Sequence, residues 1–127
     1  MRLLLDTHTT LWAIESPERL GQLGRRLIES RENEILISPV VPWEIALNAN
    51  KYHQPLIDLV TDFHNVVQNQ EFTAIPVDPL HAIRSALFPF HHRDPFDRLL
   101  AAQSLELGAP QISIDSIFDR YGVTRIW

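Results

Sequence analysis

Five carboxylates occupy places in the chain where acidic side chains are expected to meet, and together they suit metal-dependent chemistry. They are Asp6, Glu44, Asp94, Asp97 and Asp115. Asp6 and Asp115 each follow a short apolar run directly, whereas the other three fall where helices are expected to begin. Carboxylates that share a cleft repel each other, so they stay ionised together only with a cation among them. Oxygen donors favour Mg²⁺ or Mn²⁺, and such an ion can activate water and neutralise charge on a phosphodiester.

The composition narrows the class of protein further. The chain has no cysteine, which excludes disulfides, thiolate catalysis and cysteine-ligated zinc. The formal net charge of −5 argues against a general nucleic-acid binder, unless bound cations reverse the local charge at the acids. The sequence contains no glycine-rich phosphate-binding motif and no nucleophile elbow. Its apolar runs are too short to span a membrane and its start does not resemble a signal peptide, so we expect a cytoplasmic protein.

Short apolar runs alternate with helical patterns along the 127 residues. Strands are expected at 2–5, 34–38, 72–77 and 110–115, and helices at 7–14, 20–31, from about 42 to 47, 56–70, 79–87 and 94–107. Gly108 follows the last helix, where a glycine commonly ends one. The alternation predicts a single α/β domain over 1–127, with a mostly parallel central sheet flanked by helices. Ligands of such sheets bind beyond the carboxyl ends of the strands, so Asp6 and Asp115 should converge there.

A purely structural explanation competes with the chemical one. Asp94 precedes Pro95, which suits an N-cap followed by proline at the first helical position, and Asp97 then falls where a capping box carries its acid. The helix dipole likewise favours Glu44 in a first turn. Both explanations stay open at these positions. Asp6 and Asp115 are harder to explain by capping alone, because a carboxylate after a buried strand is costly unless it is paired or capping.

Histidines and arginines lie beside these acids. His91, His92 and His8 are more simply explained as solvated or packing residues than as metal ligands, since adjacent loop histidines seldom reach one ion. Arg93 and Arg98 flank the acids and could either screen them or hold a phosphate. The tryptophans are expected in the core rather than as platforms for stacked bases.

Four stretches of the sequence carry a resemblance to a known family. They read "LLLDTHTTLWAI", "ISPVVPWEIAL", "HHRDPFDRLLAAQSLELG" and "ISIDSIFDRYGV". In this order they resemble the successive motifs of PIN-domain proteins, and they are closest to the VapC-like toxins of bacterial toxin–antitoxin systems. The resemblance covers essentially the whole chain. It implies a PIN-like sheet of about four to five strands, and a Mg²⁺- or Mn²⁺-dependent endoribonuclease that is inhibited by a cognate antitoxin and is usually a homodimer.

The resemblance also assigns roles to residues of this chain. The catalytic acids of the family fall on Asp6, Glu44, Asp97 and Asp115, and the metal ligands on Asp6, Asp97 and Asp115 with Asp94 as a further contributor. We assign substrate contacts to Thr7, Ser113, Arg93 and Arg98. The chain departs from the family after "WEIA", where it reads "LNANKYHQP" without the usual glycine–lysine pair, and at Pro42. These departures concern substrate handling more than metal binding.

The sequence therefore favours a metal-dependent endoribonuclease toxin that cleaves RNA phosphodiesters. The alternative from another class is a non-catalytic protein-interaction module, whose acids only cap helices. A structure-specific DNA nuclease of the same superfamily is a weaker alternative, because the short chain has no room for the added helices that such enzymes use.

Overall fold

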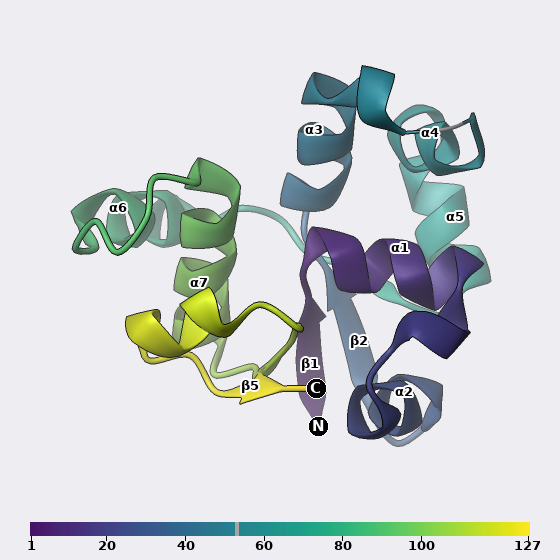
Figure 1. Ribbon diagram of the computed structural model, residues 1–127, viewed down its shortest axis with the longest axis horizontal. Helices are drawn as coiled ribbons and strands as arrows, with labels where there is room; N and C mark the ends of the chain where they lie inside the picture. The colour runs from purple at the N-terminus through teal and green to yellow at the C-terminus, as the bar shows by residue number, and fades with distance from the viewer. Residues whose placement is uncertain (53) are drawn as a thin grey trace.

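The computed structural model describes residues 1–52 and 54–127, with the backbone alone at 54 and 55, and is built around one parallel sheet (Figure 1). Its five strands are β1 (Arg2–Leu5), β2 (Glu34–Ile37), β3 (Thr73–Ala74), β4 (Gln111–Ile112) and β5 (Arg125–Ile126). They lie in the order β3-β2-β1-β4-β5, and each neighbouring pair is parallel. The predicted α/β class and the predicted number of strands are therefore confirmed.

The helices account for most of the remaining chain. They are α1 (Thr7–Glu15), α2 (Gln22–Glu29), α3 (Val40–Leu47), α4 (Gln54–Thr61), α5 (Phe63–Asn69), α6 (Pro79–Leu87) and α7 (Pro95–Leu107), with 3-10 turns η1 (Pro17–Arg19), η2 (Ala49–Lys51) and η3 (Ser116–Tyr121). Gly108 ends α7 in the left-handed conformation, with φ of 60°, as its position in the sequence predicts. No helix in the described part of the chain is long and apolar enough to cross a membrane.

Three expected elements differ from the structure in extent. The single helix expected over 56–70 is two helices, because the backbone of Asp62 leaves the helical region at φ −142° and ψ 41°. The strands expected at 72–77 and 110–115 pair over only two residues each. Prolines 76 and 110 lack the N–H that a strand ladder needs, which limits the pairing at these positions.

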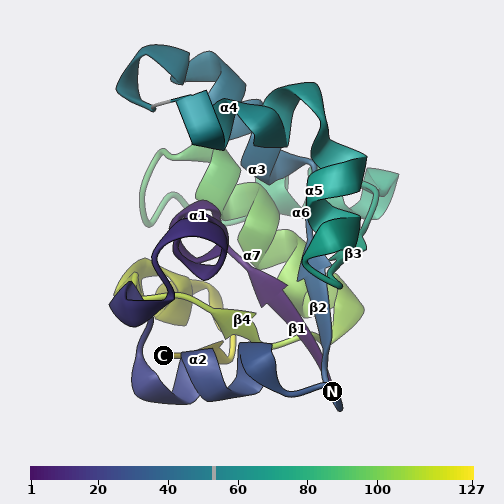
Figure 2. The same ribbon diagram turned by 90° about the vertical axis from the view of Figure 1, so that its right-hand side faces the viewer.

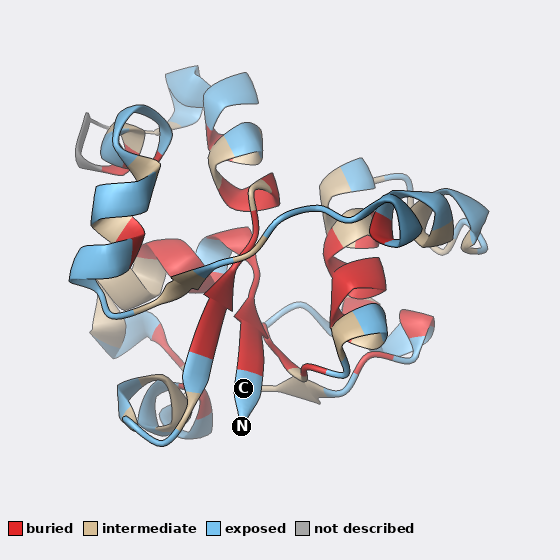
Figure 3. Ribbon diagram, turned by 180° about the vertical axis from the view of Figure 1, so that it is seen from behind, coloured by how far each residue is buried: buried red, intermediate tan, exposed pale blue. Residues whose placement is uncertain are grey.

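Helices bury both faces of the sheet, so side chains alternate between two cores. Leu3 and Leu5 pack with residues of α1, α3, α4 and α5, whereas Leu4, between them, packs with α7 and η3. Figure 2 shows α1, α2, α4 and α5 on the near side of the sheet, and Figure 3 shows β1 and β2 buried except at their first residues. Strands that are apolar on both faces are typical of parallel sheets covered by helices.

The carboxyl edge of the sheet gathers the starts of three helices. α1 follows β1 directly, α3 follows β2 after Ser38 and Pro39, and α7 begins at the same edge (Figure 1). β1 connects onward to β2 on one side, whereas β4 lies on its other side. The strand order thus reverses between β1 and β4, and this point of a parallel sheet is where ligands of such folds bind.

Candidate metal centre

A pocket of about 300 Å³ lies at this reversal point, and all five predicted acids line it. Its lining residues are Asp6, Thr7, His8, Glu44, Asp94, Asp97, Ile114 and Asp115. They come from the ends of β1 and β4, from the first turns of α1 and α7, and from α3. Glu44 is the fifth residue of α3, so the first-turn position expected for it is wrong, because the helix begins at Val40 and not near Pro42. The sequence separation between the first and the last acid shows that the fold, and not a local motif, brings them together.

Asp6 links the two central strands to the first helix. Its carboxylate is 6% exposed, and its Oδ1 accepts a hydrogen bond of 2.8 Å from the Thr9 amide, which caps α1. Its Oδ2 accepts a hydrogen bond from the Ser113 hydroxyl at the end of β4. The Asp115 amide in turn donates to the Ser113 hydroxyl oxygen at 3.0 Å. Ser113 therefore fixes both strand-end acids relative to each other.

Glu44 enters the pocket from α3. The Thr7 hydroxyl donates to its Oε2, so the first turn of α1 orients a carboxylate of a different helix. Burial raises the pKa of Glu44 above its ordinary value, against the lowering effect of the Thr7 hydrogen bond, and the charge of Asp94 raises it further. Glu44 is thus held in place, and its proton affinity is increased.

The start of α7 contributes two acids with different roles. Asp94 caps the helix by accepting hydrogen bonds from the amides of Phe96 at 2.9 Å and Asp97 at 3.2 Å. Asp97 lies within the first turn, and both acids line the pocket. Burial, followed by the charges of the other four acids with Asp94 first, raises the pKa of Asp97 to about 8. An acid with such a pKa lies in an electrostatic environment that favours a proton or a cation.

Capping and lining the pocket are combined in the same residues. Asp115 is exposed, caps η3 by accepting a hydrogen bond of 3.0 Å from the Ile117 amide, and also lines the pocket. Asp6 and Asp94 do the same for α1 and α7. Each helix start therefore aims a carboxylate at the carboxyl edge of the sheet, and the two explanations of these acids are compatible.

The donor set fits a hard divalent cation that keeps part of its hydration shell. Among residues 1–52 and 54–127, no three carboxylate or imidazole groups already surround a single point at ligand distances. Mg²⁺ is usually held by one or two carboxylates and several waters, so it does not require such a group. The raised pKa of Asp97, caused by burial and then by repulsion from the other four acids, is the observation that favours a cation among these acids.

The residues expected to contact substrate are placed differently from one another. The hydroxyls of Thr7 and Ser113 hold pocket acids, and substrate contacts by them stay a prediction, as they do for the exposed Arg93. The assignment of Arg98 to a substrate phosphate is wrong. Its side chain is 5% exposed, and its guanidinium donates to backbone carbonyls, including that of Pro89 at 2.9 Å. Buried and bonded in this way, Arg98 fixes the loop before α7 and cannot reach a ligand.

His92 is a residue whose contacts the sequence did not reveal. Its Nε2 lies 3.3 Å from Asp97 Oδ2, and its Nδ1 lies 2.7 Å from the Tyr121 hydroxyl. In "HHRDPFD" His92 lies close to the acids in the sequence, which indicates a possible contact, but the same holds for His91. Both histidines pack on the Tyr121 ring, and what distinguishes His92 is its hydrogen bonds to Tyr121, which is far away in the sequence, and to Asp97.

The acid pocket opens into two further hollows. One, of about 450 Å³, shares His8, Glu44 and Asp94 with it and also contains Lys51 and Tyr52. The next, of about 520 Å³, is lined by His8, Leu11, Trp12, Glu15, Ser16, Arg19, Lys51, Tyr52 and Leu56. The shared residues make the three hollows one continuous surface.

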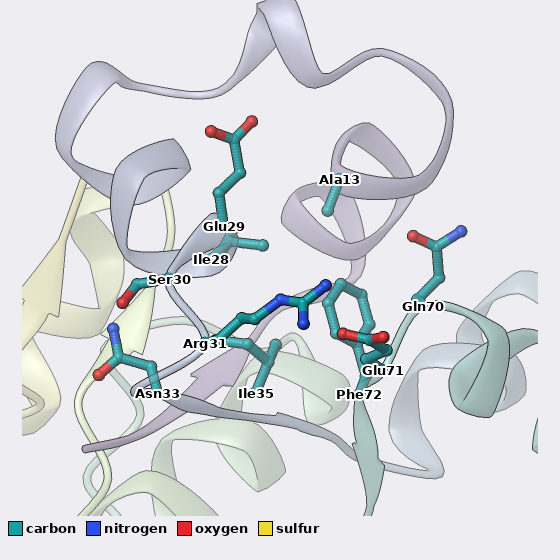
Figure 4. Close-up of a pocket in the computed structure, with 10 residues that line it drawn as sticks. All are labelled: Ala13, Ile28, Glu29, Ser30, Arg31, Asn33, Ile35, Gln70, Glu71 and Phe72. Atoms are coloured by element: carbon teal, nitrogen blue, oxygen red, sulfur yellow. The ribbon is translucent and has the colours of Figure 1, made fainter.

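A separate hollow of about 430 Å³ lies elsewhere, between α1, α2 and the loops around β2 and β3 (Figure 4). The Arg31 side chain is directed across it, above an apolar floor that includes Ile35 (Figure 4). None of the five acids lines it. The candidate chemistry is therefore confined to the carboxyl edge of the sheet.

Several solved structures have the same architecture as this chain. VapBC2 from Rickettsia felis bound to a DNA fragment from its promoter matches with a TM-score of 0.69 at 15% identity, covering 100% of this chain and 99% of that chain. VapBC-1 from nontypeable Haemophilus influenzae matches at 0.61 and 12% identity, covering 99% and 97%. VapBC-5 from Mycobacterium tuberculosis matches at 0.58 and 17% identity, covering 98% and 95%. At these identities the likeness concerns the fold.

Comparison of the sequence with known proteins adds the family. No protein of curated function matches the sequence. The family model of the PIN domain matches residues 3–123, which include all five pocket acids. Since this match covers nearly the whole chain, and the sheet and its acids have the expected arrangement, the protein belongs to the PIN-domain family.

Proposed function

We propose that this protein is a metal-dependent endoribonuclease, the toxin of a toxin–antitoxin pair. The observation that carries the proposal is the convergence of five carboxylates on one pocket, where burial and mutual repulsion raise the pKa of Asp97 to about 8. Like charges gathered at a cost to stability are a common sign of a functional site. Proteins of this family are generally nucleases, which agrees with an acidic metal centre.

Asp6, Asp97 and Asp115 would hold Mg²⁺ or Mn²⁺, directly or through water, with Asp94 contributing. When bound, the ion supplies an activated water and neutralises charge on the RNA phosphodiester. Glu44 is suited to accept a proton from that water, because its raised pKa brings it nearer to neutral pH than an ordinary glutamate. Thr7 occupies Glu44 Oε2, which leaves Oε1 as the oxygen for this transfer.

The continuous hollow beside the acids suits a single RNA strand. Lys51, the only lysine, and Arg19 bring positive charge to a protein of net charge −5. Trp12 and Tyr52 line the same hollow, so the expectation that the tryptophans lie in the core is wrong for Trp12, as it is for the exposed Trp43. Glu15 adds one acid to the hollow. Cationic groups bind backbone phosphates and aromatic rings stack bases, which together favour unpaired nucleic acid. The strand would run from these residues into the acid pocket.

The structural neighbours support the pairing with an antitoxin. Similar structures include VapBC and FitAB assemblies, and two of them are named as bound to a DNA fragment. We extend from them that this chain also binds a cognate antitoxin. A second copy of the chain as a partner follows from the resemblance to VapC-like toxins.

The test is RNA cleavage by the purified chain with Mg²⁺ or Mn²⁺ and with EDTA. Asp6→Asn and Asp97→Asn should abolish metal-dependent cleavage, whereas Asp58→Asn, at an exposed position of α4 outside the pocket, should cleave like the wild type. Cleavage that persists in EDTA, or in both pocket variants, would refute the assignment.

The non-catalytic alternative has one specific observation in its favour, since three of the five acids do cap helices. Asparagine caps as well as aspartate does, so an acid that only caps tolerates the exchange to asparagine. A binding module would also show no change in melting temperature on adding Mn²⁺. A metal centre should instead be stabilised by Mn²⁺, because a ligand that binds the folded state alone raises its stability.

A further inference from the structure

A hydrogen-bond chain connects the acid pocket to a distant tyrosine through a histidine. His92 lies in the loop between α6 and α7, with Nδ1 2.7 Å from the Tyr121 hydroxyl and Nε2 3.3 Å from Asp97 Oδ2. The side chains of His92 and Asp97 are 23% and 20% exposed, so solvent competes little for these bonds. One imidazole ring therefore bridges a pocket acid and a group from another element.

In one tautomer of the neutral His92 ring, each polar atom of the hydrogen-bond chain from Asp97 to Tyr121 has a partner. A neutral imidazole carries a single N–H, so one nitrogen donates and the other accepts. When a cation in the pocket keeps Asp97 ionised and the imidazole proton is on Nε2, His92 donates to the Asp97 carboxylate, and Nδ1 accepts the Tyr121 hydroxyl proton. Carboxylates that ligate metals in proteins are commonly oriented by such outer hydrogen bonds.

The ring of His92 is held from two directions. Tyr121 packs against it at a ring distance of 5.5 Å and against Phe88, in the same loop, at 4.9 Å. The buried Arg98 donates to the carbonyls of Phe88 at 3.0 Å and Pro89 at 2.9 Å, which fixes the course of that loop. The position of His92 is thus determined by the packing of Tyr121 on its ring and by the fixed course of the loop that carries it.

The hydrogen-bond chain also connects the two elements that carry the pocket acids Asp97 and Asp115. Tyr121 is the last residue of η3, whose cap is Asp115, and Asp97 belongs to α7. We propose that His92 is a positioning residue, which holds Asp97 Oδ2 in the orientation that a metal ion in the pocket requires. This inference rests on the proposed metal-dependent function.

Two substitutions of His92 test the roles of its two ring nitrogens independently. Glutamine at 92 reaches the place of Nε2 and can still donate to Asp97, whereas asparagine reaches only the place of Nδ1 and keeps the contact with Tyr121. Mn²⁺ affinity is measured from the signal of free Mn²⁺ in electron paramagnetic resonance. We expect His92→Asn to weaken Mn²⁺ binding about 10- to 100-fold, and His92→Gln to restore it towards the wild-type value.

The neighbouring histidine supplies a matched control. His91 packs its ring on Tyr121 at 4.8 Å, so His91→Ala removes packing on the same tyrosine and should leave Mn²⁺ affinity unchanged. If His92→Asn fails to fold, Tyr121→Phe, which keeps the ring and removes only the hydroxyl, should weaken binding in the same direction. Melting temperatures without metal establish that each variant is folded.

The outcomes distinguish this inference from the proposed function. A wild-type chain that binds no Mn²⁺ overturns both. A wild-type chain that binds Mn²⁺, with His92→Asn binding as tightly or His92→Gln as weakly as His92→Asn, overturns the positioning role alone.

Discussion

Replacing Asp97 with asparagine should make the metal-free protein more stable at pH 8 and remove much of the pH dependence of its stability. Burial and the other acids raise the pKa of Asp97 from 3.8 to about 8. Between these values the folded chain holds a proton that the unfolded chain has released, so the free energy of unfolding falls as the pH rises from about 4 to about 8. Asparagine keeps the shape of the side chain and cannot ionise.

The size of the effect follows from the same shift. One pKa unit corresponds to about 1.4 kcal/mol, so the whole shift would amount to roughly 6 kcal/mol. The side chain is 20% exposed and its neighbours share the repulsion, so water screens part of it. We expect about 2 kcal/mol at pH 8, which is roughly 5–10 °C in melting temperature for a domain of this size.

The assay is thermal unfolding in EDTA at several values between pH 5 and 8. The wild type and Asp58→Asn should lose stability over this range, whereas Asp97→Asn should change little and should melt at the higher temperature at pH 8. Parallel curves for all three proteins would show that Asp97 is not under electrostatic strain, and the argument for a cation in the pocket would lose its main support.

Three further outcomes test other parts of the structure. Asp94→Ala should lower the free energy of unfolding by about 1 kcal/mol in urea, and Asp94→Asn much less, because asparagine also caps; equal losses would contradict the capping role. Arg98→Met should cost on the order of 2–4 kcal/mol, since it leaves buried carbonyls without a donor; an unchanged urea midpoint together with weaker RNA binding would instead restore the substrate role. Lys51→Ala should raise KM for RNA and leave the melting temperature unchanged, with the exposed Arg26→Ala as control; an unchanged KM would remove Lys51 from the substrate path.

Much of the fold and of the candidate site could be predicted from the sequence, because their signals are local. The apolar run before Asp6 defines a buried strand, and Gly108 ends a helix through its own backbone preference. Asp94 followed by Pro95 begins α7 in the expected way. These features depend on residues within a few positions of each other, so the sequence alone determined where Asp6, Asp94 and Asp97 occur relative to strands and helices.

Contacts between distant residues were decided only by the tertiary structure. "HHRDPFDR" presents two histidines and two arginines beside the acids, and their types do not distinguish the roles that they take. Arg98 is buried because its side chain turns back to the carbonyls of the preceding loop, and His92 contacts Asp97 because Tyr121 arrives from the end of the chain. Such roles depend on which side chains become neighbours after folding, and the packing of the whole domain determines that.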